Sequence, residues 1–182
     1  MAKITLFGLA GTGKSSTAKL VAEALGYEFR STGNMFRDMA KEAGYDDLNA
    51  FEKEVCEKDP NFDKKLDDKT TEYGQTHDKF IFESRLAWHF IPDSIKICLI
   101  CPGDARFERI AAREGKTFEQ AKTESLEREA SIYERFQAYY HIDDLNDPNH
   151  FDIVIDSNKN NLQQVVQIIL EELAKRGVTP QK

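Results

Sequence analysis

Cysteines are few in this 182-residue sequence, and long apolar stretches are missing from it. No run approaches the roughly 20 consecutive apolar residues of a membrane-spanning helix, which argues against an integral membrane protein. Three cysteines do not make the framework of a disulfide-rich secreted domain. Lys3 is followed at once by a short strand-like run, where a signal peptide would carry a longer apolar segment. We therefore expect a cytoplasmic protein with no membrane partner.

Metal-binding patterns are also scarce. Cys98 and Cys101 form a C-x-x-C pair, but residues 96–100 read as a buried strand, in which residues three apart point to opposite faces. Cys56 stands alone, so no second pair completes a zinc site. The histidines are scattered without metal-ligand spacing, at positions 77, 89, 141 and 150. We interpret the cysteines as small core residues and the histidines as structural.

Positive charge is in the minority. The sequence has 25 Lys and Arg against 32 Asp and Glu, a net charge of −7 at pH 7. This balance argues against non-specific nucleic-acid binding, which depends on neutralising many phosphates. If the chain binds a smaller polyanion, a few Arg and Lys side chains must gather in a cleft while carboxylates cover the outer face.

One glycine-rich segment carries most of the functional signal. Residues 8–15, GLAGTGKS, fit the pattern G-x-x-x-x-G-K-[ST] and lie between an apolar strand at 4–7 and a helix at 14–25. In this arrangement backbone N–H groups and the positive end of the helix surround an anion. The predicted nucleotide-binding residues are Gly8, Gly11, Thr12, Gly13, Lys14, Ser15 and Ser16. Lys14 is expected to reach the β- and γ-phosphates, and the Ser15 hydroxyl to hold Mg²⁺.

Apolar runs alternate with helical stretches along the chain. We expect strands at residues 4–7, 27–30, 80–82, 95–100 and 153–155. We expect helices at residues 14–25, 33–43, 49–57, 62–74, 105–113, 117–139 and 160–175. The alternation predicts an α/β fold, a parallel sheet wrapped by helices in a single domain over residues 1–182. The loops that follow the strands should then gather around one cleft, beyond the carboxyl ends of the strands.

Two segments depart from plain alternation of strand and helix. Residues 46–77 form a charged, helical insertion without a strand, whose charges mostly indicate a solvated face with some lining a pocket. Residues 114–117 (EGKT) interrupt two helices and suggest a hinge. Residues 178–182 have the character of a frayed tail.

A second polar motif follows the strand expected at residues 27–30. Thr32 is placed to cap the next helix, Gly33 lets a ligand come close, and Arg37 lies one turn into the helix, aimed at the cleft. An Arg there suits a dianionic phosphate, because its fork donates two parallel hydrogen bonds. A surface ion pair between Arg37 and a neighbouring carboxylate is the alternative.

Residues 83–85 (ESR) come at the end of the strand expected at 80–82. With the usual strand order they face the phosphate loop. Glu83 would then hold water around Mg²⁺, and Arg85 would bind a second phosphate. A structural ion pair between Glu83 and Arg85 is the alternative.

Arginines recur on two consecutive predicted helices. Arg109 and Arg113 are four apart on one helix, so they share a face. Beyond Gly115, Arg128 and Arg135 are seven apart and share a face of the next helix. Two helices that join at a short hinge and direct arginines to one place describe a lid that closes on transferring phosphates. A solvated amphipathic helix with salt bridges is the alternative.

Residues 156–159 (DSNK) follow the last expected strand. Ser157 and its neighbours are placed to border a purine ring through backbone groups. The segment also resembles the guanine-reading N-K-x-D of GTPases, but Asn161 replaces the Asp that would bind the guanine amine. Selectivity for GTP is therefore not supported.

Taken together, these motifs resemble those of the nucleoside monophosphate kinases, and most of all the short cytidylate kinase type of archaea and some bacteria. The resemblance covers nearly the whole length. It is carried by residues 8–15, 31–33 with 36–37, 58–60 followed by Asp63 and Asp67, 83–87, 109–111 with 113–115, Arg128 with Arg135, and 152–157. Two positions depart from the family: Ser84 stands where members often carry Gly, and Ile132 where they often carry an acidic residue that meets the sugar.

The resemblance implies a P-loop NTPase three-layer fold with a five-stranded parallel sheet, an NMP-binding insertion at residues 34–77 and a lid at 113–136. It implies transfer of the γ-phosphoryl group of ATP, with Mg²⁺ as cofactor, to a nucleoside monophosphate, CMP or dCMP foremost. Arg109 would flank the ATP base. The implied catalytic residues are Lys14, Arg113, Arg128 and Arg135, and the acceptor-binding residues are Thr32, Gly33, Arg37, Asp63, Asp67 and Arg85. We expect a monomer with small-molecule partners and no nucleic-acid partner.

Two other functions stay open at this point. Another small P-loop kinase, acting on shikimate, dephospho-coenzyme A or a sugar acid, would need an Asp base for its hydroxyl acceptor. Asp38, Asp63 and Asp67 are not obviously placed for that role. A nucleotide-binding regulator, such as a GTPase-like switch or an assembly ATPase, would carry N-K-x-D or a glutamine poised on water, and neither is evident.

Overall fold

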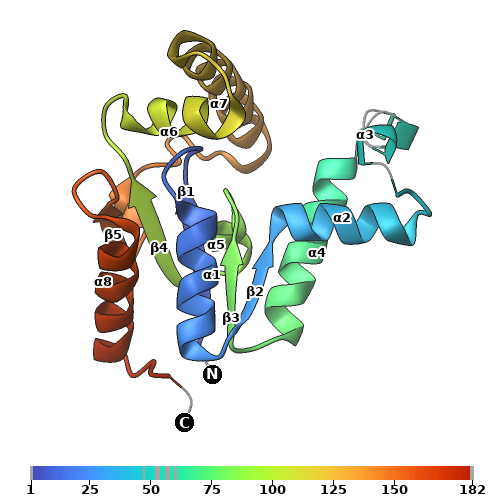
Figure 1. Cartoon of the computed structure of the whole chain (residues 1–182). Coiled ribbons are helices and arrows are strands. Elements are labelled where there is room, and N and C mark those ends of the chain that lie inside the picture. The colour runs from blue at the N-terminus through green and yellow to red at the C-terminus, as the bar shows by residue number, and fades with distance from the viewer. Residues whose placement is uncertain (1, 47, 52–53, 56–57, 60, 181–182) are drawn as a thin grey trace.

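The computed structural model describes residues 2–46, 48–51, 54–55, 58–59 and 61–180. Five parallel strands form one sheet in the order β2-β3-β1-β4-β5 (Figure 1). The strands are β1 (Lys3–Gly8), β2 (Glu28–Ser31), β3 (Phe80–Glu83), β4 (Ile95–Ile100) and β5 (Ile153–Asp156). The expected five-stranded parallel sheet is confirmed, and each expected strand boundary lies within one residue of the observed boundary.

Helices connect the strands and flank the sheet. They are α1 (Lys14–Leu25), α2 (Thr32–Glu42), α3 (Leu48–Phe51), α4 (Phe62–Thr76), α5 (Ala87–Phe90), α6 (Ala105–Glu114), α7 (Phe118–Tyr140) and α8 (Leu162–Lys175), with the 3-10 helix η2 (Pro148–His150). Helices α5 and η2 were not expected from the sequence, because four and three residues are too few to show a helical period. The helix expected at 49–57 lies partly outside the described residues, as do Cys56, Pro60 and the last two residues of the expected tail.

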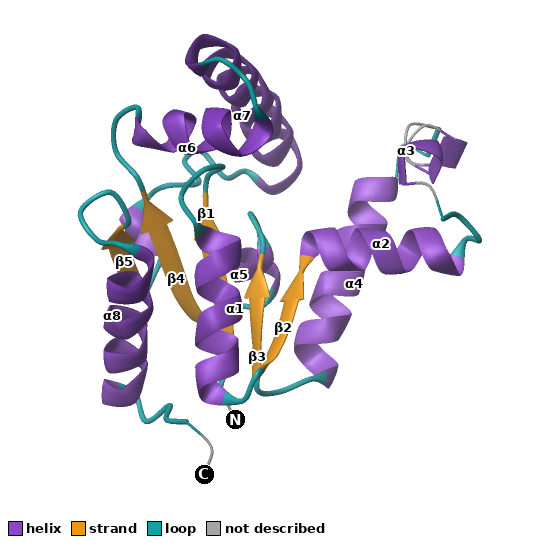
Figure 2. Ribbon diagram, in the orientation of Figure 1, coloured by secondary structure: helices purple, strands orange, loops and turns teal. Residues whose placement is uncertain are grey.

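The strands send alternate side chains into two apolar layers. Ile4 and Leu6 of β1 belong to the core cluster that α1 and α8 cover. Phe7 packs on the opposite face, with Trp88 and Ile132. Figure 2 shows the resulting three layers, with α1 and α8 in front of the sheet and α5 behind it. Because both faces are covered, the inner strands β1, β3 and β4 are mostly apolar in sequence, whereas the edge strand β2 (EFRS) is not.

The phosphate loop joins the central strand β1 to α1. Gly11 and Gly13 have φ angles of +81° and +83°, a left-handed backbone that favours glycine. A Cβ on Gly11 would come within 2.3 Å of the Arg106 backbone oxygen. Beyond the loop, α1 buries Ala18 and Val21 completely against the sheet. The loop is therefore held between a buried strand and a buried helix face.

Helices α2, α3 and α4 extend from the β2 edge of the sheet (Figure 1). They share a small core of their own around Ala40, Phe51 and Phe62. The Phe36 ring meets the edges of Phe51 and Phe62 at centroid distances of 5.3 and 5.9 Å. This separate aromatic core holds the projecting helices together as a unit, where the helical insertion was expected.

Helices α6 and α7 lie above the carboxyl ends of the strands (Figure 1). Gly115, with φ of +65°, terminates α6, and Thr117 begins α7 in a capping box with Gln120. The two helices pack through Phe107 and Ala121. The hinge expected at residues 114–117 is thus a tight turn between two capped helices.

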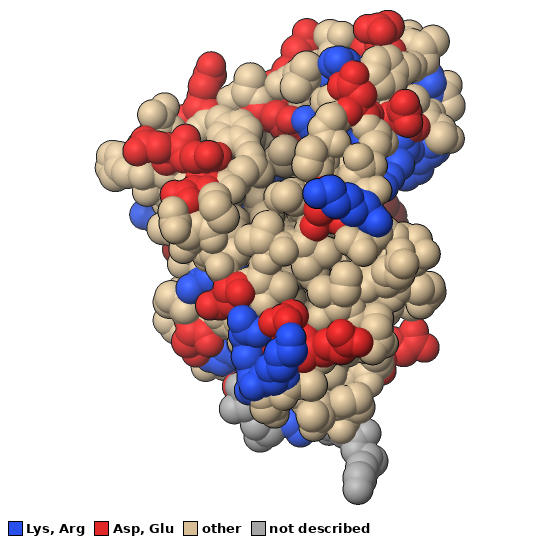
Figure 3. Space-filling model, turned by 90° about the vertical axis from the view of Figure 1, so that its left-hand side faces the viewer, with Lys and Arg blue, Asp and Glu red and all other residues tan. Residues whose placement is uncertain are grey.

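The face seen from the β5 and α8 side carries both signs of charge. Figure 3 shows Lys and Arg interspersed with Asp and Glu there, without a broad basic patch. A polyanion meeting this face would encounter carboxylates as well as cations. Among the described residues, no helix has both the length and the apolar character needed to cross a membrane.

Candidate active site

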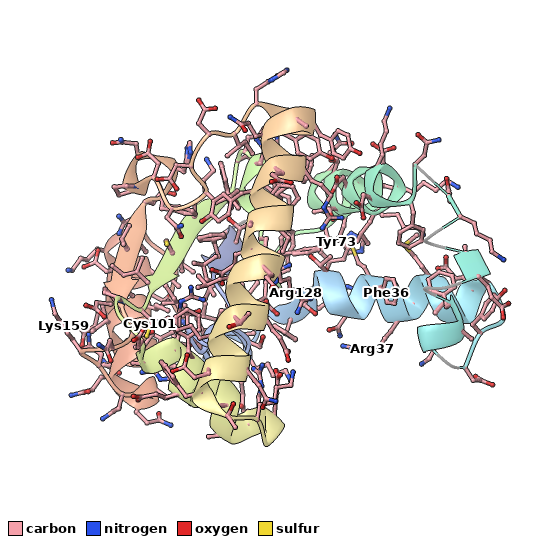
Figure 4. The ribbon with its side chains drawn as sticks, turned by 90° about the horizontal axis from the view of Figure 1, so that it is seen from above. Phe36, Arg37, Tyr73, Cys101, Arg128 and Lys159 are labelled. Carbon is pink, nitrogen blue, oxygen red and sulfur yellow. The ribbon has the colours of Figure 1, made fainter. Side chains whose placement is uncertain are left out.

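A cavity of about 600 Å³ opens between the carboxyl ends of the strands, α2, α4 and α7. This is the size of a small-molecule site. The predicted residues that line it are Lys14, Ser15, Thr32, Gly33, Arg37, Asp63, Asp67, Glu83, Arg85, Arg128 and Arg135. Seen from above, α7 crosses between the sheet and α2, and Arg128 lies beside the start of α2 (Figure 4). The fold thus brings the predicted acceptor residues, both predicted metal ligands and two lid arginines together.

A smaller hollow of about 170 Å³ lies over the phosphate loop. Its lining residues are Gly11, Gly13, Lys14, Ser15, Ser16, Arg109 and Arg113. Lys14 and Ser15 line both this hollow and the larger cavity. The two spaces therefore meet at the start of α1.

Gly8 and Thr12 shape the phosphate loop from within. The Thr12 hydroxyl donates to the Leu9 carbonyl at 2.9 Å and is almost fully buried. A Cβ on Gly8 would lie 2.5 Å from that hydroxyl oxygen. These two predicted residues fix the loop conformation rather than offering side chains to a ligand.

Lys14 has an environment that favours an anionic ligand. Burial lowers the pKa of Lys14 below its ordinary value, and the charges of Arg85 and Arg113 lower this pKa further. Glu83, whose carboxylate lies 3.6 Å from the Lys14 Nζ, opposes the shift. A phosphate at this position would stabilise the ammonium in the same way as Glu83 does, and more strongly.

Ser15 and Glu83 offer oxygen ligands for a divalent cation. The Ser15 hydroxyl donates to Glu83 Oε2 across 3.0 Å. Oxygens at adjacent octahedral positions of Mg²⁺ lie about 3 Å apart, because each Mg–O bond is about 2.1 Å, so the pair fits. Among the described residues no group of three or more His, Cys, Asp and Glu could hold a metal ion. Most other ligands would then be water and phosphate oxygens, as is usual for Mg²⁺.

Arginines converge at the roof of the cavity. Burial lowers the pKa of Arg85, and the charges of Arg128 and Arg135 lower it further against the opposing charge of Glu129. Within the part of the chain that the structure describes, the Arg85 and Arg128 guanidinium groups have no ion pair. The alternative pairing of Arg85 with Glu83 is absent, since Glu83 contacts Lys14 and Ser15 instead. Arg85 and Arg128, two neighbouring cations without an ion pair among the described residues, indicate an anionic ligand.

The start of α2 differs from the expectation in one respect. The predicted cap Thr32 is wrong: Ser31 has the extended backbone of an N-cap, and its hydroxyl accepts from the Asn34 N–H at 3.1 Å. The Thr32 hydroxyl is buried without a hydrogen-bond partner among the described residues. Arg37 donates to the Asn34 side-chain oxygen at 3.2 Å, rather than to a carboxylate. Its charge is therefore not neutralised by a neighbour on α2.

The two predicted carboxylates of α4 contact the lid helix. Arg135 donates to Asp63 Oδ2 at 2.9 Å, and the Tyr140 hydroxyl donates to Asp67 Oδ2. Burial raises the pKa of Asp67 to about 6, and the hydrogen bond from Tyr140 opposes this rise. Tyr140 was not among the site residues expected from the sequence. A tyrosine at the end of an amphipathic helix is most simply read as a core residue, and no local pattern reveals a partner 73 residues away.

Arg109 links the phosphate loop to the loop after β5. One of its nitrogens donates to the Gly11 carbonyl at 3.3 Å and another to the Ser157 carbonyl at 2.8 Å. The Ser157 hydroxyl donates to the Ile100 carbonyl at 3.1 Å. Arg109 and Ser157 therefore stand together beside the smaller hollow, the position suggested for a nucleotide base.

The four lid arginines do not converge on one point. Arg113 donates to the neighbouring Glu114 at 2.6 Å, and 65% of its side chain is exposed. It lines the hollow over the phosphate loop, whereas Arg128 and Arg135 line the larger cavity. A third hollow, of about 160 Å³, is lined by Arg113 together with Arg85 and Arg128. A ligand that spans both spaces would contact arginines from both ends of the lid.

Part of the wall of the larger cavity is apolar, and its residues were not among the site residues expected from the sequence. The residues are Phe29, Phe36, Leu66, Phe90 and Phe136. An apolar wall beside a cationic end suits a ligand with a flat ring and a phosphate. Helical spacing signals that such residues share a face, but not whether that face meets the core or a cavity.

Comparison with known proteins identifies relatives along almost the whole chain. The family model described as the cytidylate kinase-like family matches residues 3–159. A cytidylate kinase of Haloarcula marismortui is 39% identical over 169 residues, which cover 92% of this chain and 86% of that protein. A cytidylate kinase of Methanocorpusculum labreanum is 38% identical over 178 residues, which cover 96% of this chain and 99% of that protein.

Solved structures share the fold at low sequence identity. An uncharacterized protein from Eubacterium ventriosum matches with a TM-score of 0.75 and 16% identity, covering 97% of this chain and 100% of that one. Shikimate kinase from Aquifex aeolicus matches with a TM-score of 0.60 and 18% identity, covering 96% and 98%. These structural neighbours support the P-loop kinase fold alone. The sequence matches go further: the chain belongs to the cytidylate kinase-like family and is an enzyme of the nucleoside monophosphate kinase class.

Proposed function

We propose that this enzyme transfers the γ-phosphoryl group of ATP to CMP or dCMP, giving ADP and the nucleoside diphosphate. The observation that carries the proposal is the meeting of two spaces at Lys14 and Ser15. The hollow over the phosphate loop suits the ATP phosphates. The cavity of about 600 Å³ suits a second nucleotide, whose phosphate would lie between the two.

The reaction needs no catalytic base. The second pKa of a phosphate monoester is near 6, so the acceptor is already largely ionised at pH 7. The protein then contributes positioning, charge neutralisation and exclusion of water, which a loose phosphoryl-transfer transition state rewards. Arg37 and Arg85 are proposed to hold the acceptor phosphate. Lys14, Arg113, Arg128 and Arg135 are proposed to neutralise charge on the transferred group.

Ser15 and Glu83 are proposed to hold Mg²⁺, with Glu83 acting directly or through water. Their separation of 3.0 Å suits adjacent ligands of that ion. A Mg²⁺ ion held there would neutralise charge on the phosphate groups of ATP. Arg109 and Ser157, beside the phosphate loop, are proposed to border the ATP base.

Base selection is proposed to depend on the carboxylates of α4. Asp67, and Asp63 beside it, line the cavity opposite the phosphate loop. An ionised carboxylate accepts a hydrogen bond from the cytosine amino group, whereas uracil presents a carbonyl at that position. A buried polar group left without its partner can discriminate by about 10⁴.

Sugar selection is proposed to be weak. Ile132 lines the cavity and is 4% exposed, so an apolar side chain lies where a hydrogen-bonding group could have distinguished ribose. Apolar contacts discriminate by small energies, so we expect CMP and dCMP to differ by no more than about tenfold in kcat/KM.

A kinase with a hydroxyl acceptor, such as shikimate, is disfavoured by the sequence relatives, which are named cytidylate kinases. Such a reaction needs a carboxylate as base, and Asp63, one of the two carboxylates of α4 in the cavity wall, is paired with Arg135. The structural likeness to shikimate kinase extends to the fold only.

The test is a coupled assay of ADP release with CMP, dCMP, UMP, AMP, GMP and shikimate as acceptors, each with and without Mg²⁺. We expect turnover with CMP and dCMP, much lower kcat/KM with the other nucleotides, and none with shikimate. Comparable values for UMP or AMP would overturn the cytidylate assignment and leave the kinase reading in place. Turnover with shikimate alone would overturn the assignment of a nucleoside monophosphate as acceptor.

A further inference from the structure

Tyr140 at the last residue of α7 reaches a carboxylate in the cavity wall. Its hydroxyl donates to Asp67 Oδ2, on α4. Asp67 lines the cavity, and one of its two carboxylate oxygens accepts this hydrogen bond. In the described part of the chain, no side chain donates to Asp67 Oδ1. One oxygen is held by the protein and the other stays available to a ligand.

The tyrosine ring is fixed by its neighbours. It packs against the Phe90 ring at a centroid distance of 5.2 Å and the His89 ring at 5.6 Å. The Phe136 ring, one turn earlier on α7, lies 6.3 Å away. Burial and the Asp67 carboxylate raise the pKa of Tyr140 above its ordinary value, so its hydroxyl remains a donor at every working pH. The contact therefore comes from a rigid, permanently protonated group.

The charges around Asp67 come from three helices. Asp63 and Asp68 on α4 raise its pKa, after burial, which is the main cause. The hydrogen bond from Tyr140 on α7 lowers this pKa, and Arg135 of α7 neutralises Asp63 at 2.9 Å. Arg37 on α2 lines the same cavity.

We propose that Tyr140 is a positioning residue that holds Asp67 as an oriented hydrogen-bond acceptor and so sets the preference for an acceptor base with an amino group. The inference rests on the proposed function, since it assigns a determinant of base choice within that site. An ionised Asp67 accepts from the cytosine amino group. A protonated Asp67 could instead donate to the uracil carbonyl, so the preference should depend on the protonation of this one group.

The pH dependence follows from the direction of the shift. With a pKa of about 6, Asp67 is ionised above pH 7 and becomes protonated as the pH falls through 6. Loss of the Tyr140 hydrogen bond removes a stabilisation of the anion, so the pKa of Asp67 should rise by about one to two units. Without that hydrogen bond, Asp67 should become protonated, and so stop accepting a hydrogen bond from the base, at a higher pH.

The experiment compares wild type, Tyr140→Phe and the matched control Tyr139→Phe, whose tyrosine is 62% exposed. The measured quantity is the ratio of kcat/KM for CMP to that for UMP between pH 5.5 and 8.5. The phosphates of both acceptors titrate alike, so their ionisation cancels in the ratio. We expect the ratio at pH 7 to fall about two- to tenfold in Tyr140→Phe and to stay unchanged in Tyr139→Phe. The midpoint of the pH dependence of this ratio should move to higher pH in Tyr140→Phe.

Two further measurements separate this inference from the proposed function. The carboxyl titration of Asp67, followed by NMR without substrate, should move upward in Tyr140→Phe whatever the acceptor is. Asp67→Asn should give a low, pH-independent CMP preference, and adding Tyr140→Phe should change it no further. A Tyr140→Phe enzyme of lower thermal stability with a wild-type ratio at all pH values would overturn the inference. Absence of turnover with any nucleoside monophosphate in wild type would overturn the proposed function, and the inference with it.

Discussion

Arg106 and Glu129 form a buried, bidentate ion pair that fastens α6 to α7. The two nitrogen–oxygen distances are 2.5 and 2.8 Å, and the residues are 8% and 9% exposed. The Arg106 guanidinium also lies over the Phe107 ring, 4.0 Å from its centroid. Glu129 follows Arg128 directly on α7, so the pair fixes the helix that carries the cavity arginines.

Breaking this pair should destabilise the fold strongly. Glu129→Gln leaves the Arg106 charge buried without a counter-charge, and such losses cost about 3–5 kcal/mol. The free energy of unfolding, from denaturant titration, measures the effect. Glu124→Gln is the matched control, since Glu124 pairs with Lys116 at the surface and should leave the unfolding midpoint nearly unchanged. Equal shifts in the two variants would contradict the role of the buried pair.

Lys14→Ala should abolish most of the turnover while leaving the fold intact. Lys14 lines both spaces of the site, and its only ion pair, among the described residues, is the 3.6 Å contact with Glu83. A preorganised charge donor contributes about 10²–10³ in kcat. Steady-state kinetics with CMP and ATP measure the loss, with Lys175→Ala on α8 as the control because that side chain is 68% exposed. Retention of more than about a tenth of the wild-type kcat would show that the phosphate-loop assignment is wrong.

Substitutions of the arginines in the site should fall into two groups, one that mainly changes KM for the acceptor and one that mainly changes kcat. Arg37→Ala and Arg85→Ala should mainly raise KM for the acceptor, by roughly tenfold or more, since each removes charged hydrogen bonds to a bound phosphate. Arg113→Ala and Arg135→Ala should depress kcat more than KM, because their contacts strengthen as charge develops in the transition state. Both constants are measured for each variant. The sorting fails if Arg113→Ala and Arg135→Ala change only the affinity for ATP.

The two phosphate-loop glycines should respond differently to alanine. Gly11 and Gly13 share left-handed backbones, so either substitution should cost about 1–2 kcal/mol of strain. At Gly13 the added methyl group meets nothing within 4 Å, whereas at Gly11 it meets the backbone of Arg106 at 2.3 Å. Gly11→Ala should therefore lower the melting temperature clearly more than Gly13→Ala. Equal melting temperatures would argue against close packing of the loop on α6.

The family and the fold could be predicted from local sequence. The apolar runs of the strands, the helical periods and the GLAGTGKS loop each occupy a few consecutive residues, and each has a fixed geometric consequence. Parallel strands then place the loops after β1 and β3 at one edge, which is why Ser15 and Glu83, both predicted from the sequence as metal ligands, lie within hydrogen-bonding distance. The wrong prediction of the α2 cap also concerns neighbouring residues. Ser31 and Thr32 are both good caps, and only the backbone angles decide between them.

The sequence by itself determined the elements and the phosphate-binding loop, because hydrophobic period and turn chemistry are encoded within neighbouring residues. Only the tertiary structure decided the partners of the long side chains. Asp63 meets Arg135 across 72 positions, Asp67 meets Tyr140 across 73, and Arg106 meets Glu129 across 23. Periodicity gives the face on which a side chain lies but not the helix packed against it. The partner is chosen when α7 docks over the cavity, since buried charges and hydroxyl groups must then find counterparts within hydrogen-bonding distance.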